Sequence, residues 1–328
     1  MYRVPRYLHC ALVLLALACP AQAADGLRPE VEAFVQEMSA RHGFDIGELR
    51  ELMGRAQKRE AILRVMSRPG TAITWAQYRK RIVDRVRIEG GARFWRTHAQ
   101  ALERASLEYG VPEELIVATI GIETLYGRHT GNIPVIDALS TLAFDYPRRA
   151  AFFRGELEEY LLLVREAGLD APGTEGSYAG AIGIPQFLPS SYRKYAVDFD
   201  GDGRRDLVDS VADAIGSVAN YYRTFGWEAG APVIAEADSG EAELAPLIAG
   251  GIQPHISIGE LRKRGLAIEG KVKEDALAAV FFVQEERGPR LVLGLNNFYV
   301  ITRYNRSTNY AMAVHELARE IKAAFQFR

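Results

Sequence analysis

Residues 110–127 read GVPEELIVATIGIETLYG, and this stretch decides the fold because it predicts a central, largely apolar helix. A proline suits the first turn of a helix, and two glutamates directly after it suit the positive end of the helix dipole. The pattern predicts a helix that begins near Pro112, runs to Tyr126 and stops at Gly127.

An acidic side chain interrupts the apolar stripe of this helix. Ile116, Thr119, Ile120 and Glu123 are three, four and seven positions apart, so they share one face. A carboxylate on such a face loses water, which raises its pKa and keeps it protonated near neutral pH. A protonated carboxyl can act as a general acid on a glycosidic oxygen. The alternative is a structural role for Glu123, in which its buried carboxylate is hydrogen-bonded by an arginine or by a backbone amide.

Three segments, in this order along the chain, carry a resemblance to a known family. The first is GIETLYG at 121–127, and the second is GAIGIPQFLPSS at 180–191. The third comprises FY at 298–299, TRYN at 302–305 and YAMA at 310–313. Together they resemble the membrane-bound lytic transglycosylase B family, and the match covers nearly all of the chain after its leader.

This resemblance implies an enzyme that cleaves peptidoglycan without water and without a catalytic cofactor. Such lytic transglycosylases cut the β-1,4 bond between N-acetylmuramic acid and N-acetylglucosamine and leave 1,6-anhydro ends. Carried over, Glu123 would first protonate the leaving oxygen and then remove the proton of the muramoyl 6-hydroxyl. Two alternatives stay open: a muramidase-type hydrolase that admits water, and a non-catalytic peptidoglycan-binding protein.

The resemblance also implies a sugar-binding cleft lined by aromatic and amide side chains. Tyrosine rings stack on sugar faces, and amides can bind N-acetyl groups. The residues expected in this cleft are Ser177, Gln186, Phe187, Tyr221, Tyr304, Asn305 and Tyr310, with Tyr78 as a weaker candidate. Arg148 and Arg149 resemble an arginine pair that meets the peptide stem; the alternative is a solvated helix start. His129 has no evident partner and is expected to be structural or exposed.

Residues 198–209 read DFDGDGRRDLVD and fit a twelve-residue EF-hand loop. Acids stand at the first, third, fifth and ninth positions, and a glycine at the sixth allows the turn. The predicted ligands of a structural Ca²⁺ are Asp198, Asp200, Asp202, Arg204 through its carbonyl, Asp206 and Asp209. The last ligand is an aspartate in place of the usual glutamate, so we expect modest affinity. An acidic turn without an ion is the alternative.

The predicted fold is mainly α, with a lysozyme-like catalytic core, an N-terminal helical domain and a small β insertion. The helical domain spans residues 24–110 and is joined by a C-terminal helix within 305–328. The core spans 111–228, and the β-containing domain spans 229–304. Within these, Gly90-Gly91 predicts a helix break, Pro69-Gly70 predicts a turn, and residues 290–302 favour a strand.

The first 23 residues have the pattern of a secretory signal peptide. A charged start precedes a short apolar run and the sequence Ala21-Gln22-Ala23, which predicts export to the periplasm. Lipidation at Cys19, giving an outer-membrane lipoprotein, is the rival interpretation. Cys10 and Cys19 are the only cysteines and both lie in this leader, so no disulfide is expected in the exported protein.

The net charge of the protein limits the classes of partner that it can attract. The net charge of −2 gives no strong field to recruit nucleic acid. The resemblance, and not the charge, implies that the partner is the peptidoglycan glycan strand, and cell-wall synthases are candidate protein partners. We expect a monomer.

Overall fold

The structure is a computed structural model, and it describes residues 26–67, 73–238 and 243–327. The predicted signal peptide with Cys19, and the predicted turn at Pro69-Gly70, lie outside the described residues. The chain divides into two compact units, one up to Arg50 and one from Glu51 onward. The predicted domain boundaries therefore stay predictions.

The first unit contains helix α1 (Pro29–His42) and the first half of α2 (Ile46–Arg55). One side of α1 is buried, as the helical spacing of Val31, Phe34, Val35 and Met38 predicts. Gly43 ends the helix in the left-handed conformation at φ 68°, which glycine adopts without a steric cost.

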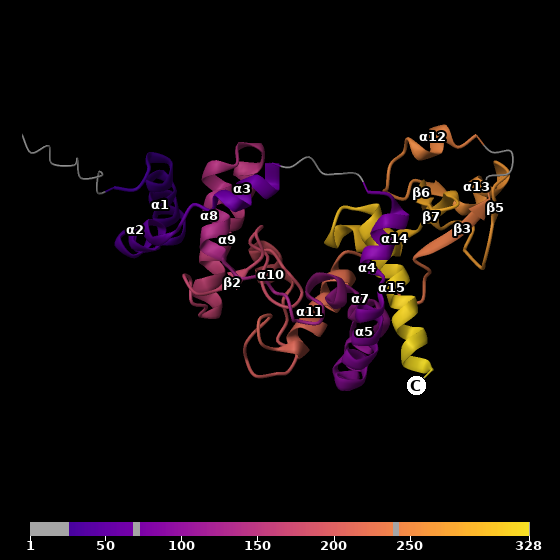
Figure 1. Ribbon diagram of the computed structural model, residues 1–328, viewed down its shortest axis with the longest axis horizontal. Helices are drawn as coiled ribbons and strands as arrows, with labels where there is room; N and C mark the ends of the chain where they lie inside the picture. Colours follow the sequence, from indigo (N-terminus) through magenta and orange to yellow (C-terminus); the bar gives the residue numbers. More distant parts are fainter. Residues whose placement is uncertain (1–25, 68–72, 239–242, 328) are drawn as a thin grey trace, which may run out of the picture. The chain divides into compact units, whose positions relative to one another are not determined.

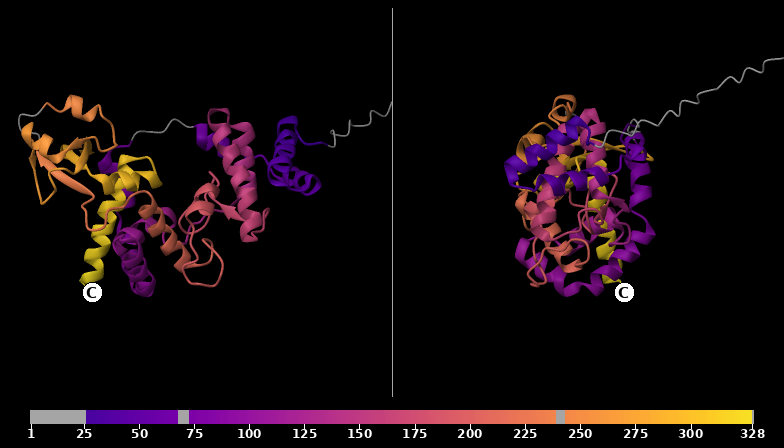
Figure 2. Two further views of the ribbon diagram at one scale, coloured as in Figure 1. Left: turned by 180° about the vertical axis from the view of Figure 1, so that it is seen from behind. Right: turned by 90° about the vertical axis from the view of Figure 1, so that its left-hand side faces the viewer.

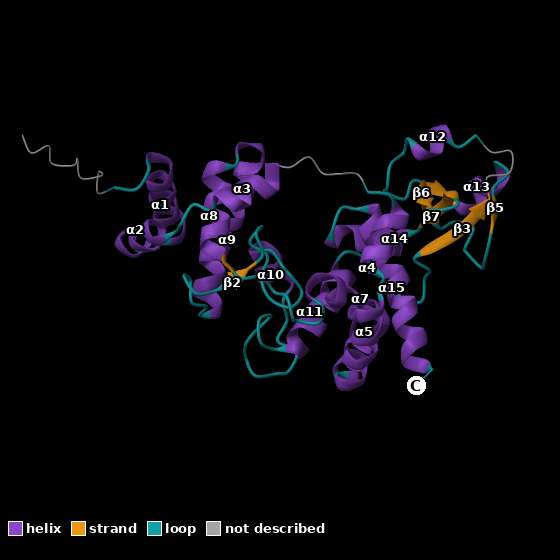
Figure 3. Ribbon diagram, in the orientation of Figure 1, coloured by secondary structure: helices purple, strands orange, loops and turns teal. Residues whose placement is uncertain are grey.

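The second unit is mostly helical (Figures 1 and 3). Its longer helices are α3 (Glu60–Ser67), α4 (Trp75–Ile82), α5 (Arg85–Thr97), α6 (Ala99–Tyr109), α7 (Glu113–Thr124), α8 (Val135–Asp145), α9 (Ala150–Ala167), α10 (Pro189–Tyr195), α11 (Val211–Thr224), α14 (Asn296–Tyr304) and α15 (Thr308–Gln326). A 3₁₀ turn at Pro147–Arg149 separates α8 from α9, and β1 (Ile133–Pro134) pairs with β2 (Glu175–Gly176).

Helix α7 lies at the centre of this unit because it is apolar on nearly every side. Eight of its residues are buried, from Leu115 to Gly121 and at Thr124. It packs against α5, α6, α11 and α15, and Figure 2 shows the C-terminal α15 (yellow) running beside α5. A helix that is hydrophobic all round is stable only when other helices enclose it in this way.

The predicted helix break at Gly90-Gly91 is wrong, since α5 continues through both glycines. Their lack of a side chain serves packing instead. A Cβ on Gly90 or on Gly91 would lie 2.7 Å from an atom of the Tyr126 ring or hydroxyl. Only glycine therefore allows the segment after α7 to pack against α5.

The small β-sheet has five antiparallel strands in the order β4-β6-β7-β3-β5. They are β3 (Ile234–Asp238), β4 (Ile256–Ser257), β5 (Ala267–Ile268), β6 (Leu277–Glu285) and β7 (Gly288–Gly294), with short helices α12 (Ala245–Ile248) and α13 (Ile258–Lys263). Leu261, Val280 and Leu293 belong to a buried cluster beneath this sheet. The prediction of a mainly helical fold with a small β-sheet is confirmed.

The predicted strand over residues 290–302 is confirmed up to Gly294 and is wrong beyond it. Strand β7 ends at Gly294, and the chain turns at Leu295 into helix α14. A Cβ on Gly294 would lie 2.8 Å from the Phe298 ring, so the helix folds back directly onto the end of the strand. An apolar run looks alike in a buried helix and a buried strand, which explains the error.

Candidate active site

Glu123 lies in the last turn of α7, and its side chain is half-buried. Burial raises the pKa of its carboxyl from 4.5 to about 7, because the charged form loses water. The Tyr310 hydroxyl donates a hydrogen bond of 2.5 Å to Oε1, which acts in the opposite direction and limits the rise in pKa. Among the described residues, Oε2 accepts no hydrogen bond, so one oxygen stays available to a substrate.

The chain just after Glu123 holds this helix end in place. Leu125 and Tyr126 adopt left-handed φ values of 51° and 64°, so α7 ends at Thr124, two residues before the predicted end. Tyr126 donates a hydrogen bond of 2.5 Å to the Arg87 carbonyl. Left-handed backbone at residues with side chains is strained, and such strain clusters at active sites.

A second anchor joins this helix end to the glycine- and proline-rich segment 180–191. The buried Thr124 hydroxyl donates to the Ile184 carbonyl at 2.8 Å. Gln186 has φ 54°, and its Nε2 donates to the carbonyls of Thr130 and Gly183, each at 2.9 Å. The amide donors of Gln186 are therefore used to shape the loop.

An aromatic cluster surrounds the carboxyl of Glu123. The Tyr304 and Tyr310 rings lie nearly parallel, with centroids 6.4 Å apart. Tyr304 also contacts Phe187 and Tyr221, at centroid distances of 5.7 and 4.9 Å. Burial, and then the charge of Glu123, raise the pKa of Tyr304 and Tyr310 well above the ordinary value. These hydroxyls therefore stay protonated and act as hydrogen-bond donors.

Tyr78 and Tyr222 complete this cluster from α4 and α11. Burial raises the pKa of both hydroxyls, and the nearby charge of Glu123 raises it further. Tyr222 is fully buried, and its hydroxyl lies 2.8 Å from Thr119 Oγ1. Tyr221 is among the predicted cleft residues, whereas Tyr222 is not. The signal was available, since Tyr222 continues the buried stripe of α11.

The other predicted cleft residues have no described contact with Glu123. Arg148 and Arg149 are exposed on the 3₁₀ turn, and the Arg149 guanidinium lies 4.2 Å from the centre of the Phe152 ring. Ser177 Oγ accepts hydrogen bonds from its own loop, from the amides of residues 179 and 181. Asn305 is exposed just after α14. The substrate-binding roles of these four residues stay predictions, as do those of the other predicted cleft residues.

Comparison with known proteins identifies the fold around this site. Residues 26–319 match the family model described as the transglycosylase SLT domain. The chain belongs to this transglycosylase family. It is similar to membrane-bound lytic murein transglycosylase B of Escherichia coli, at 41% identity over 90% of this chain and 83% of that protein.

Solved structures of the family share the same fold. Soluble lytic transglycosylase SltB1 from Pseudomonas aeruginosa is 47% identical, with a TM-score of 0.86 over 90% of this chain and 99% of that one. Escherichia coli Slt35 in complex with calcium is 42% identical, with a TM-score of 0.84 over 92% of this chain and 95% of that one. The predicted family and the lysozyme-like fold are thus confirmed, and the comparisons favour the transglycosylase over both alternatives.

The predicted EF-hand loop lies between α10 and α11 of this transglycosylase. Carboxylate oxygens of Asp198, Asp200 and Asp202 all lie within 4.8 Å of one another. In the described part of the chain, Asp206 and Asp209 do not belong to that cluster. Asp206 Oδ1 instead accepts hydrogen bonds from the backbone amides of Val208 and Asp209.

One further acid, which is not among the predicted ligands, shapes the loop. Asp213 is fully buried at the start of α11. Its two carboxylate oxygens accept hydrogen bonds from the backbone amides of Phe199 and Asp206, each at 2.7 Å. Asp213 therefore fixes the first and last parts of the loop to the helix that carries Tyr221 and Tyr222.

Proposed function

We propose that this protein is a lytic transglycosylase of peptidoglycan, and that Glu123 is its single acid–base group. The observation that carries this proposal is the half-buried carboxyl whose pKa of about 7 leaves it partly protonated at neutral pH. A family member similar over most of the chain is a murein transglycosylase, which supports the same substrate.

The first chemical step is protonation of the glycosidic oxygen. Glu123 gives its proton to the N-acetylglucosamine leaving group while the bond to C1 of the muramoyl residue breaks. Positive charge develops on C1 and the ring oxygen. The carboxylate left behind is negative and beside that charge, which stabilises it in a site with little water.

The second step closes the anhydro ring. The ionised Glu123 removes the proton of the muramoyl 6-hydroxyl, and O6 attacks C1 to form the 1,6-anhydro bond. The proton taken up equals the proton given, so the enzyme returns to its starting state and no water is consumed. Tyr310 holds Oε1 at 2.5 Å throughout, which leaves Oε2 to carry the proton both ways.

Within the described ranges, no second acid acts on Glu123, and this supports the route over hydrolysis. Hydrolytic glycosidases use two carboxyl groups, about 5–9.5 Å apart. In the described residues, no other carboxylate contributes to the pKa shift of Glu123; burial and Tyr310 account for it. A water-activating base is therefore not evident beside the site.

Residues around the acid would hold the sugars. We assign stacking on sugar faces to Tyr78 and Tyr304, in keeping with their positions near Glu123. We assign hydrogen bonding of N-acetyl groups to Gln186, whose side chain is anchored to the Thr130 carbonyl. Peptide-stem contacts remain assigned to Arg148 and Arg149, which are exposed.

The acidic loop would bind Ca²⁺ as a structural ion. Three carboxylates within 4.8 Å repel one another unless a cation is present, and oxygen donors suit Ca²⁺. The similar Slt35 has been solved in complex with calcium. Asp198, Asp200 and Asp202 would hold the ion, whose charge would relieve that repulsion. We expect chelation to lower the melting temperature of the wild type but not that of Asp200→Asn/Asp202→Asn, and an equal loss in both would refute the site.

We further propose that the protein works in the periplasm on glycan strands, as a monomer. No helix among the described residues is long and apolar enough to cross a membrane. Membrane attachment, if it occurs, would use lipidation of Cys19.

Mass spectrometry of sacculi digested by the purified protein tests the function directly. We expect products that end in 1,6-anhydro-N-acetylmuramic acid, and none from Glu123→Gln. Reducing muramic acid ends would show hydrolysis instead. Cleavage by the glutamine variant would refute the assignment of the acid.

A further inference from the structure

An ion-pair network outside the Glu123 site joins α4 to α15 and to the β-sheet. Glu316 of α15 is at its centre: one carboxylate oxygen lies 2.5 Å from Arg79 of α4, and the other lies 3.3 Å from Arg290 of β7. Arg290 in turn pairs with Glu236 of β3 at 2.7 Å and with Glu285 of β6 at 2.8 Å. A single side chain therefore connects α4 and α15 to three strands.

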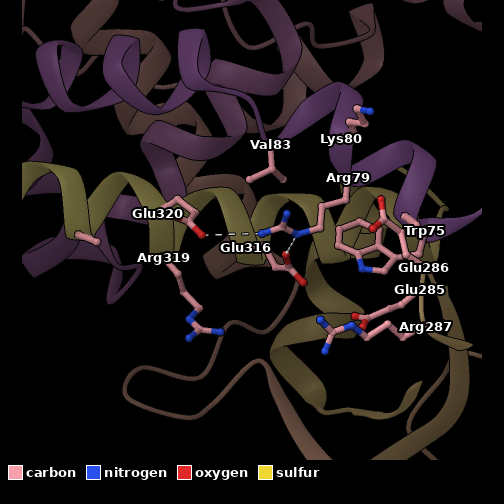
Figure 4. Close-up of a pocket in the computed structure, with 12 residues that line it drawn as sticks. Trp75, Arg79, Lys80, Val83, Glu285, Glu286, Arg287, Glu316, Arg319 and Glu320 are labelled. Carbon is pink, nitrogen blue, oxygen red and sulfur yellow. Dashed lines mark hydrogen bonds and ion pairs between the residues drawn. The ribbon is translucent and has the colours of Figure 1, made fainter. Parts of the chain in front are cut away.

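Glu316 is the better shielded of the two glutamates that meet Arg79. Its side chain is 15% exposed, whereas that of Glu320, which lies 3.8 Å from Arg79, is 48% exposed. Figure 4 shows the Arg79 guanidinium directed at both acids, with a dashed line to each. Water screens exposed ion pairs more than shielded ones, so Glu316 holds Arg79 more strongly than Glu320 does. In agreement, the hydrogen bond to Glu316 is the main cause that raises the pKa of Arg79.

Arg79 directly follows Tyr78, which reaches toward the proposed acid. Burial, and then the charge of Glu123, raise the pKa of the Tyr78 hydroxyl, so the two groups lie near each other. The Tyr78 ring also stacks on the buried Trp75, with centroids 6.5 Å apart. Consecutive residues of a helix point about 100° apart. A contact that fixes the direction of Arg79 therefore also fixes the direction of Tyr78.

Helix α15 provides the frame on which α4 is held. Tyr310, in the first turn of α15, donates its hydrogen bond to the proposed acid, so this helix is itself fixed relative to the site. Asn309 donates a hydrogen bond of 3.1 Å to the Ile73 carbonyl, just before α4. The second link, from Glu316 to Arg79, comes seven residues later on α15 and six residues after Ile73. A helix as short as α4 is marginal alone, so its place depends on contacts such as these two.

We propose that Glu316 is a positioning residue, which acts through Arg79 to hold Tyr78 in place for the sugar. The inference rests on the proposed function, in which Tyr78 stacks on a sugar face beside Glu123. Glu316 acts indirectly, because it pairs with Arg79 and Arg290 while the Tyr78 ring meets the substrate. Once Arg79 is released, α4 can rotate and the Tyr78 ring no longer faces the sugar. Substrate binding then weakens, while Glu123 keeps its own hydrogen bond.

The kinetics of Glu316→Ala on soluble peptidoglycan strands test the proposal. For the full-length protein, kcat and KM are measured by the release of anhydro ends. We expect KM to rise about fivefold, within the range for the loss of one aromatic contact, and kcat to stay close to that of the wild type. A merely destabilised protein would behave in the opposite way, since a smaller folded fraction lowers kcat and leaves KM unchanged. Glu320→Ala is the matched control, because it removes a more exposed acid of α15 near the same arginine, and it should leave both constants unchanged.

A double-mutant cycle with Tyr78→Ala shows whether Glu316 acts through that ring. Tyr78→Ala should raise KM by itself, and Glu316→Ala should raise it no further in that background. Arg79→Ala removes the same link at a side chain that is 44% exposed, so the fold tolerates it, and KM should rise as it does in Glu316→Ala. The proposal is overturned if Glu316→Ala leaves KM unchanged, or raises it equally with and without the Tyr78 ring. The failure of the proposed function looks different: the wild type would then release no anhydro ends.

Discussion

The raised pKa of Glu123 predicts that replacing this acid stabilises the protein at neutral and alkaline pH. In the folded state the pKa is about 7, against 4.5 in the unfolded chain. The protonated form is thus favoured by folding, so wild-type stability is greatest below pH 4.5. It falls as the pH rises from 4.5 to 7, and levels off above pH 7.

The size of this effect follows from the pKa difference. A shift of one unit corresponds to about 1.4 kcal/mol, so the shift of Glu123 corresponds to about 3 kcal/mol above pH 7. Glutamine cannot ionise, and its Oε1 can still accept the hydrogen bond from Tyr310. Glu123→Gln should therefore match the wild type near pH 4 and exceed its stability by about 3 kcal/mol at pH 8.

Thermal unfolding followed by circular dichroism, at a series of pH values and constant calcium, measures this difference. About 3 kcal/mol corresponds to a rise in melting temperature of roughly 5–10 °C at pH 8. A difference between variant and wild type that does not change with pH would refute the burial argument for Glu123. Glu156→Gln serves as the contrast. Glu156 accepts hydrogen bonds from the Ser190 amide and hydroxyl, so an amide donor there should destabilise the fold.

Three further predictions test the surroundings of the acid. Tyr310→Phe removes the hydrogen bond that lowers the pKa of Glu123, so the alkaline limb of the activity profile should move to higher pH; an unmoved limb would contradict the assignment. Asp213→Asn replaces one acceptor oxygen with an amide donor and so leaves one buried loop amide without its partner; it should cost about 2 kcal/mol, measured by chemical denaturation, together with weaker calcium binding by calorimetry. Gly121→Ala puts a Cβ 2.5 Å from the Tyr126 hydroxyl, so it should lower kcat at least tenfold, and unchanged kcat would show that this packing does not position Glu123.

The sequence by itself predicted Glu123 as the acid, the family and the acidic loop, and the comparisons confirm the family. Local spacing put Glu123 on one helical face with Ile116, Thr119 and Ile120, and it showed the alternating acids of the loop. The family came from the resemblance of three short motifs, which also favoured a catalytic role for Glu123. Such patterns need no knowledge of distant parts of the chain. The mainly helical class followed from the same periodicity.

The tertiary structure alone decided what surrounds the acid and how each group is used. Tyr310 is 187 residues from Glu123, and Tyr222 is 103 residues from Thr119, so no local pattern predicts either hydrogen bond. Gly90 indicated a helix break, yet α5 continues because Tyr126 needs the space of a missing side chain. Helical and strand periods describe one element at a time, whereas the pKa of Glu123 depends on which elements exclude water from it, and only packing sets that.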